Sequence, residues 1–204
     1  MNIETEFESK FFPVNKEGFR KKLKKLGAVL KIPERKMKRI VADRRANPQL
    51  KHGYIRVRDE GNLIRLSVKE MAKESGSLSD QKEADIIVSD FDKTVQIIES
   101  CGIKFNRFQE TLREEWEFKG AQVTIDTWPF LDSFCEVESD SEEKVKEIAE
   151  KIGFDWNKKI ITATPEIYAR VYKLNIEEVL DKVSNITFKK NPFKGLKKYK
   201  LVYN

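Results

Sequence analysis

The chain of 204 residues is long enough for one substantial domain or two small ones, and 39% of its residues are hydrophobic, which is compatible with a packed core. No apolar run approaches the roughly 20 residues of a membrane span, and the acidic N-terminus lacks the basic and hydrophobic regions of a signal peptide. The 40 basic and 34 acidic residues give a net charge of +6, a weak indication of nucleic-acid binding. We therefore expect a cytoplasmic globular protein without membrane association.

Histidine and cysteine are too scarce for several common kinds of catalytic site. His52 is the single histidine, which argues against Ser/His/Asp triads, Cys/His pairs and histidine-rich zinc sites. The two cysteines, Cys101 and Cys135, do not have the spacing of metal ligands, and we expect both to be free and buried. Any metal in this protein would therefore be held by carboxylates.

The first predicted element is a strand, "IETEFESKF", over residues 3–11. Successive side chains of a strand point to opposite faces of the sheet. Glu4, Glu6, Glu8 and Lys10 therefore share one face, which must meet water, a metal or a ligand.

Three later segments share the layout of a short amphipathic helix. Each begins with a residue that commonly caps a helix and reaches a glycine twelve positions later. The three pairs are Asn15 and Gly27, Asp90 and Gly102, and Ser141 and Gly153. Apolar residues recur at helical spacing in each segment, as at Val95, Ile98 and Cys101, so each helix has one face to bury.

Between these helices lie strand-like runs separated by turn signals. The runs cover residues 36–43, 54–70 with a turn at 59–62, 83–89, 105–128 with a turn at 119–120, and 133–139. With the opening strand they make about eight strands. Most of them alternate a charged face with an apolar one.

The position of the charged faces decides the architecture. For any single strand, the simpler interpretation is that the charged face meets solvent. Three amphipathic helices, however, need apolar sheet surface to cover, which places the apolar faces outside and the charged faces inside. Eight strands suffice for a closed barrel. The sequence therefore predicts an α+β fold in which a barrel with a polar lumen is surrounded by helices.

A lumen with both signs of charge needs contents, because buried charges are costly unless they are paired or coordinated. The cations that could hold a polyanion are Lys10, Arg56, Arg58, Arg65, Lys69 and Arg113. The carboxylates that would repel it are those of Glu4, Glu6, Glu8, Asp126, Glu136 and Glu138. A hard divalent cation that bridges carboxylates to phosphate oxygens resolves the conflict. The predicted ligand is a metal-complexed polyphosphate.

An ordered set of short motifs resembles a known family. "EFESK" fits the pattern E-x-E-x-K, and it is followed in order by "RVR", "LSVKE", "KEADI", "TLREEW", "VTIDTWP" and "FCEVES". This set resembles the CYTH superfamily, the triphosphate tunnel metalloenzymes that include thiamine triphosphatases, inorganic triphosphatases and class IV adenylate cyclases. The resemblance covers roughly residues 1 to 170.

The resemblance implies an eight-stranded antiparallel β-barrel that forms a tunnel. The triphosphate would be bound by Lys10, Arg56, Arg58, Lys69 and Arg113. Arg65 is added to this set because it shares one face of its strand with Lys69. Mg²⁺ or Mn²⁺ would be bound by Glu6, Glu8, Asp126, Glu136 and Glu138. The expected catalytic residues are Glu6, Glu8, Lys10 and Arg58. The tunnel domain would span residues 1–185, followed by a basic tail, 186–204.

Several other residues receive structural interpretations. Glu83 is expected either to partner a tunnel arginine or to be solvated. The tryptophans, including Trp128, are expected to pack in the core or at its rim, with no role in the site. The basic tail is interpreted as a solvated terminus that aromatic residues such as Phe193 could anchor.

Three functions remain open at this point. The first is metal-dependent hydrolysis of a triphosphate, the second is cyclisation of ATP to cyclic AMP and pyrophosphate, and the third is binding without catalysis. Cyclase-like members of the family often carry a cation where this chain has Thr111, and the loop of residues 71–81 has no nucleobase-binding signature. These features favour hydrolysis. The expected partner is a small-molecule triphosphate; nucleic acid is not expected, and a homodimer remains open.

Overall fold

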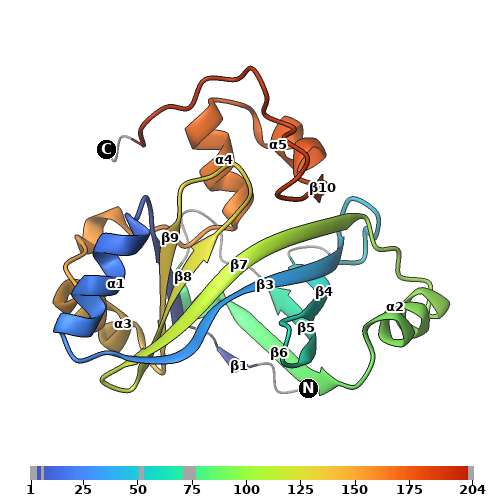
Figure 1. Cartoon of the computed structure of the whole chain (residues 1–204). Helices are drawn as coiled ribbons and strands as arrows, with labels where there is room; N and C mark the ends of the chain where they lie inside the picture. Colours follow the sequence, from blue (N-terminus) through green and yellow to red (C-terminus); the bar gives the residue numbers. More distant parts are fainter. Residues whose placement is uncertain (1–3, 6, 51–52, 71–76, 202–204) are drawn as a thin grey trace.

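The strands of this protein form one curled antiparallel sheet (Figure 1), seen in a computed structural model that describes residues 4–5, 7–50, 53–70 and 77–201. The order along the sheet is β1 (Glu4–Thr5), β6 (Lys82–Val88), β5 (Ile64–Glu70), β4 (Gly53–Asp59), β3 (Val29–Asp43), β7 (Arg107–Phe118), β8 (Ala121–Thr127), β9 (Phe134–Ser139) and β2 (Phe7–Phe11). β1 and β2 are two parts of the opening segment, and they pair with β6 and β9 at the two ends of this order. Counting that segment once gives eight strands, so the predicted antiparallel fold is confirmed.

Most predicted strands and the three predicted helices lie near their expected positions, but the strand predicted over residues 36–43 begins earlier, at Val29, and the helices and short strand that follow Gly153 were not predicted. Off the order given above, a further short strand, β10 Asn185–Ile186, pairs with β7 in parallel. The helices are α1 Lys16–Lys25, α2 Phe91–Ser100, α3 Glu142–Lys151, α4 Thr164–Tyr172 and α5 Ile176–Lys182. Two short 3₁₀ helices span Leu78–Asp80 and Trp156–Lys158.

The three predicted helices begin and end as their capping residues indicate. Asn15, Asp90 and Ser141 each accept a hydrogen bond from a backbone N–H of the first helical turn. The glycines that follow the helices, among them Gly27 and Gly153, have φ values of +83° and +90°. Glycine adopts this left-handed conformation without steric cost, which allows the chain to leave each helix sharply.

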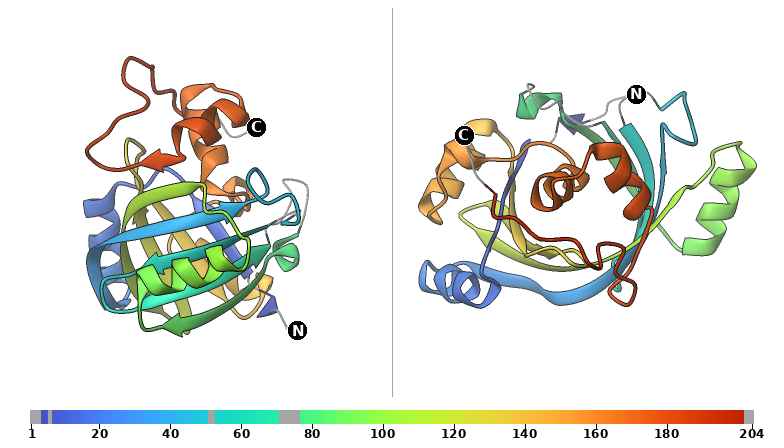
Figure 2. Two further views of the ribbon diagram at one scale, coloured as in Figure 1. Left: turned by 90° about the vertical axis from the view of Figure 1, so that its right-hand side faces the viewer. Right: turned by 90° about the horizontal axis from the view of Figure 1, so that it is seen from above.

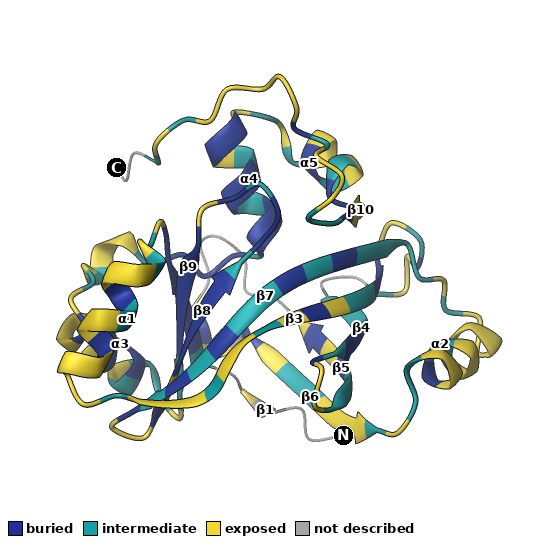
Figure 3. Cartoon of the chain, viewed as in Figure 1, coloured by how far each residue is buried: buried dark blue, intermediate teal, exposed yellow. Residues whose placement is uncertain are grey.

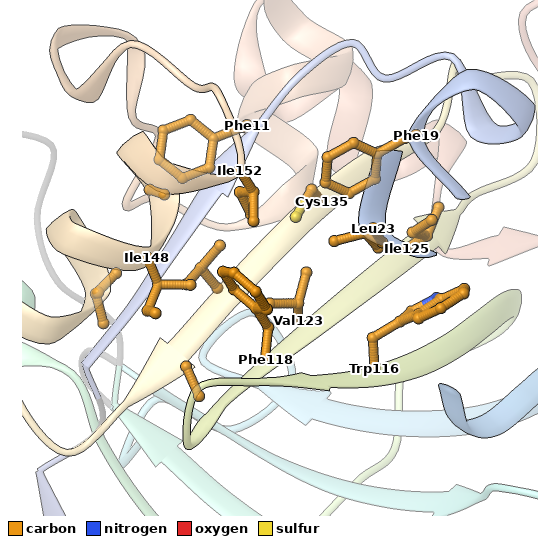
Figure 4. Packing of buried hydrophobic residues seen from close by; sticks show 14 of the residues in the cluster. Phe11, Phe19, Leu23, Trp116, Phe118, Val123, Ile125, Cys135, Ile148 and Ile152 are labelled. Atoms are coloured by element: carbon orange, nitrogen blue, oxygen red, sulfur yellow. The ribbon is translucent and has the colours of Figure 1, made fainter. Parts of the chain in front are cut away.

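Helices α1 and α3 cover the outer face of β2, β8 and β9 (Figure 4). Leu23 of α1 and Ile148 of α3 are fully buried, and they join Val123 and Val137 of the sheet in one apolar cluster. Since the apolar faces of these strands point outward under the helices, their charged faces point inward. The inside-out arrangement predicted from strand parity is confirmed for this half of the barrel.

Helix α2 does not bury the face that its spacing predicted. Thr94 is its one buried residue, and Ile97 is 64% exposed. Cys101, expected to be buried, is exposed, whereas Cys135 is buried as predicted; both are free. Figures 1 and 2 show α2 on the outer side of the strands β3 to β6, and no residue of α2 belongs to either apolar cluster of the described core, so its apolar face stays largely exposed.

The C-terminal segment forms a second apolar cluster. Figures 1 and 2 show α4 and α5 above one end of the curled sheet, within the outline of the strands when seen from that side. Phe193 is buried and stacks on Tyr168 and Tyr172, with ring centroids 5.0 and 4.3 Å away. The domain boundary at residue 185 stays a prediction. Among the described helices, none has the length and apolar character needed to cross a membrane.

Candidate active site

A cavity of about 530 Å³ lies inside the barrel and is lined mainly by charged side chains. Its cations are Lys10, Arg39, Arg56, Arg58, Arg65, Lys69, Arg107 and Arg113. Its carboxylates are Glu8, Glu60, Glu83, Asp85, Glu115, Asp126, Glu136, Glu138 and Asp140. The alternation of each strand explains this lining, because residues two apart on one strand share a face.

The structure gathers the predicted site residues in this one cavity. Glu6 lies outside the described residues, and so does the side chain of Glu4, which was expected to face the lumen. All the others line the cavity: Glu8, Lys10, Arg56, Arg58, Arg65, Lys69, Arg113, Asp126, Glu136 and Glu138. The roles assigned to them stay predictions, but their convergence from six strands is established.

The described carboxylates that were predicted to bind metal lie on β2, β8 and β9. Glu8 stands opposite Glu138 across the β2–β9 pair, and Lys10 stands opposite Glu136. Lys10 forms an ion pair with Glu8 and lies 3.6 Å from Glu136. On the adjacent strand, Asp126 accepts a hydrogen bond of 2.8 Å from Arg113. One face of the tunnel thus carries a row of acids with cations inserted between them.

Electrostatic crowding in this row separates the pKa values of its acids. Burial and the nearby Glu8 charge raise the pKa of Glu138 from its ordinary value of 4.5 to about 7. Burial and Glu8 also raise the pKa of Glu136. Burial acts in the same direction on Glu8, but Lys10 and Lys69 outweigh it and hold the pKa of Glu8 well below its ordinary value. Excess negative charge is therefore concentrated around Glu136 and Glu138.

The cations on β4 and β5 are organised by a second set of acids. Arg56 donates to Glu83 at 2.9 Å, and Lys69 lies 3.4 Å from the same carboxylate. Glu83 is thus a partner of tunnel cations, the first of the two alternatives that the sequence left open. Arg58 and Arg65 both donate to Glu60, at 2.6 and 3.1 Å.

Several residues that line this cavity were not predicted, among them Glu60, Arg107, Trp128 and Arg39. Glu60 was assigned to a turn, yet its side chain is buried beside Arg58. Arg107 is an even number of residues from Arg113 on β7 and therefore shares its face of the strand, so the alternation of side chains could have identified it. Trp128, expected to have no role in the site, lines the cavity, and the guanidinium carbon of Arg39 lies 4.3 Å from its ring centroid.

A divalent metal is compatible with the donor chemistry of this site. Glu8, Glu136 and Glu138 supply hard oxygen ligands from neighbouring strands. Burial and the Glu8 charge raise the pKa of Glu138, and a cation bound there would offset the second of these effects. Among the described residues, which exclude the predicted ligand Glu6, no three such side chains are arranged as a finished metal site. Lys10 occupies the space between two of them. The metal stays a prediction.

Comparisons with known proteins identify the fold family. The model of the CYTH domain matches residues 4–172. This chain belongs to the CYTH family. Among curated proteins, no sequence matches it.

Solved structures share the CYTH fold at low sequence identity. A candidate adenylate cyclase from Vibrio parahaemolyticus has a TM-score of 0.68 and 12% identity, covering 82% of this chain and 99% of that one. A conserved hypothetical protein from Pyrococcus furiosus has a TM-score of 0.64 and 19% identity, covering 78% and 96%. A protein from Hippeastrum, described as having a dominant triphosphatase activity, has a TM-score of 0.52 and 12% identity, covering 80% and 94%. These likenesses support the fold.

Proposed function

We propose that this CYTH protein is a triphosphatase that depends on Mg²⁺ or Mn²⁺ and removes the terminal phosphate of a linear triphosphate. The observation that carries the proposal is the uneven distribution of charge in one cavity: cations outnumber carboxylates on β3 to β7, whereas carboxylates outnumber Lys10 on β2, β8 and β9. A triphosphate matches the first of these regions and a divalent cation matches the second.

The arginines of the tunnel are suited to phosphate oxygens. Arg56 and Arg58 are both buried and present planar forks of N–H donors. Burial and the neighbouring charges of Arg56 and Arg113 lower the pKa of Arg58 to about 10. A bound polyanion would relieve the repulsion between these arginines, and this relief would add to the free energy of binding.

The carboxylate row would hold the metal through Glu8, Asp126, Glu136 and Glu138, with Glu6 as the further expected ligand. When bound, the metal supplies a Lewis acid that polarises the phosphoryl group. Lys10, whose pKa is raised because Glu8 and Glu136 outweigh its burial, keeps its proton and would donate to a phosphoryl oxygen. Catalysis then consists of positioning and charge stabilisation, for which no histidine or cysteine nucleophile is needed.

Hydrolysis is favoured over cyclisation by one position in the cavity wall. Thr111, where cyclase-like relatives often have a cation, is 3% exposed and lines the cavity. A cyclase must align a ribose hydroxyl with the α-phosphate, and a small misplacement can cost on the order of 100-fold in rate. A hydrolase needs a positioned water in place of that hydroxyl, which is a lighter demand.

The test separates the three functions by their products. The protein is incubated with ATP, thiamine triphosphate or tripolyphosphate and with Mg²⁺ or Mn²⁺, and orthophosphate, pyrophosphate and cyclic AMP are quantified. Orthophosphate should exceed cyclic AMP with every substrate that turns over. Cyclic AMP with pyrophosphate as the main products of ATP would replace the hydrolase by a cyclase. Tight binding without any product would reduce the protein to a binding module.

A further inference from the structure

Arg39 differs from the other cations that line the cavity. Each of the others forms an ion pair with a carboxylate, for example Arg58 with Glu60 at 2.6 Å and Arg113 with Asp126 at 2.8 Å. Arg39 has no carboxylate partner within the part of the chain that the structure describes. Its positive charge is therefore left uncompensated at the cavity wall.

Neutral groups hold the guanidinium of Arg39 in place. Its Nε donates to Oε1 of Gln109 at 2.9 Å, and its carbon lies 4.3 Å from the ring centroid of Trp128. Cation–π contact and a neutral hydrogen bond fix the orientation without neutralising the charge. Burial and the charges of Arg56 and Arg58 lower its pKa to about 9, which also indicates a cation in need of an anion.

The strand register places Arg39 in a row of arginines. Arg39 stands opposite Arg58 across the β3–β4 pair, and Arg58 stands opposite Arg65 across the β4–β5 pair. All three line the cavity. Arg58 pairs with Glu60, and Arg65 pairs with both Glu60 and Asp85, whereas Arg39 pairs with neither of these described carboxylates and adds its full charge to the row.

The supports of Arg39 are themselves held by the C-terminal segment. Nε2 of Gln109 donates to the carbonyl of Val183 at 2.9 Å, and Ile186 of β10 pairs with Gln109. The ring of Trp128 lies 6.3 Å from that of Tyr168 in α4. Val183 and Ile186 lie beyond the residues matched by the CYTH model. The orientation of Arg39 is thus coupled to a part of the chain outside the family match.

We propose that Arg39 is a further phosphate-binding residue of this tunnel, and that Gln109, held by Val183, is its positioning residue. The inference rests on the proposed function, because it assigns Arg39 to the polyphosphate of the same site. It predicts that affinity for polyphosphate depends on the C-terminal segment as well as on the motif residues of the barrel.

The test measures binding without turnover. Calorimetry gives the Kd of tripolyphosphate in EDTA and, with Mg²⁺ present, of its non-hydrolysable imido analogue. Arg39→Met, which keeps the aliphatic stem, should weaken both by about 10- to 100-fold, the loss expected for a charged hydrogen-bond donor. Arg39→Lys should restore part of the affinity. The matched control is Arg45→Met, since Arg45 pairs with Asp181 outside the cavity.

The positioning role of Gln109 has a separate readout. Gln109→Met should weaken binding in the wild-type background but cause no further loss in Arg39→Met, because the two residues act through one contact. Additive losses would assign Gln109 a merely structural role. Equal Kd values for wild type and Arg39→Met, both folded by circular dichroism, would overturn the inference about Arg39 alone. Failure of the wild-type protein to bind tripolyphosphate would overturn the proposed function as well.

Discussion

The two halves of the barrel differ in how their outer faces are covered (Figure 3). On β8 and β9, Ile125 and Val137 are completely buried beneath α1 and α3. On β5 and β6, Val68 is 39% exposed and Ile86 is 60% exposed. One half is therefore a layer of a packed core, whereas the other has little behind it.

The same division separates the charges inside the tunnel. Carboxylates such as Glu136 and Glu138 predominate in the covered half, whereas cations such as Arg58 and Arg65 outnumber their carboxylate partners in the thinly covered half. A small divalent metal such as Mg²⁺ demands near-ideal ligand geometry, which tightly packed strands can maintain. Long arginine side chains can adjust to a polyanion, so their strands need less support. The comparison teaches that packing is concentrated behind the carboxylates, the residues that would require the greatest precision under the proposed function.

The largest expected effect comes from the acids of the covered half. Glu138→Gln and Glu136→Gln keep the size of the side chain and remove a ligand charge. Each should lower metal-dependent turnover roughly 100- to 1,000-fold and raise the metal concentration required. The measurement is orthophosphate release as a function of Mg²⁺ or Mn²⁺. The control is Glu143→Gln, on the exposed first turn of α3. Wild-type rates for Glu138→Gln and Glu136→Gln would exclude both glutamates from the proposed metal site.

Truncation of an isoleucine on each half tests the packing difference directly. Ile148→Ala removes a fully buried side chain from α3 and should lower the free energy of unfolding by about 2 to 5 kcal/mol. Ile86→Ala, on the exposed face, should change it by less than about 0.5 kcal/mol. Urea denaturation measures both. Equal losses would show that the β5–β6 face is as closely packed as the other half.

Strand parity accounts for most of what the sequence could predict about the site. Alternation placed Arg56 and Arg58, Asp126 and Glu136 on one face of their strands, and the cavity contains them all. Arg39 was not predicted because β3 carries charges on both faces at this point, with Lys38 exposed beside it. Alternation carries no signal where both faces are polar.

The remaining errors arise from tertiary contacts. The capping signals of α2 were correct, since Asp90 caps it, but capping does not specify what a helix packs against. The side chain of Glu60 lies beyond the end of β4, where neither strand parity nor turn chemistry predicts burial. Its position depends on Arg35, Arg58 and Arg65, which converge on it from three strands.

A pH dependence should distinguish the metal-free carboxylate row from the rest of the protein. The pKa of Glu138 is about 7 in the folded protein, above its ordinary value of 4.5, so the folded state holds this proton more tightly than the unfolded chain. The stability contributed by Glu138 is therefore present below pH 4.5 and lost as the pH rises through 7. Glu138→Gln should be more stable than wild type by about 2 to 3 kcal/mol at pH 8 and similar to it at pH 4.

Urea denaturation in EDTA across this pH range measures the difference between the two proteins. Saturating Mg²⁺ should stabilise the wild type more than Glu138→Gln at pH 8, because the metal compensates the charge that the substitution removes. A constant stability difference from pH 4 to pH 8 would contradict the raised pKa of Glu138.

The smallest expected effect comes from single cations of the thinly covered half. Arg56→Ala leaves Glu83 within 3.4 Å of Lys69, and Arg58→Ala leaves Glu60 paired with Arg65 at 3.1 Å. Because each substitution leaves the buried carboxylate with another cation as its partner, the fold should be preserved. Each should weaken tripolyphosphate binding by about 10-fold, which is the loss expected for one charged hydrogen-bond partner. Orthophosphate binding should weaken by less, because a longer polyanion contacts more of the tunnel cations.

Calorimetry with both ligands in EDTA separates this effect from metal binding, with Arg45→Met as the control for the loss of a remote positive charge. The losses for Arg56→Ala and Arg58→Ala should persist without metal, because these arginines would contact phosphate oxygens directly. The deficit of Glu138→Gln should instead appear when Mg²⁺ is present. Equal losses for tripolyphosphate and orthophosphate would contradict a linear triphosphate site. If the losses of affinity for Arg56→Ala and Arg58→Ala disappear in EDTA, these arginines act through the metal, and the assignment of one half of the tunnel to phosphate and the other to metal is wrong.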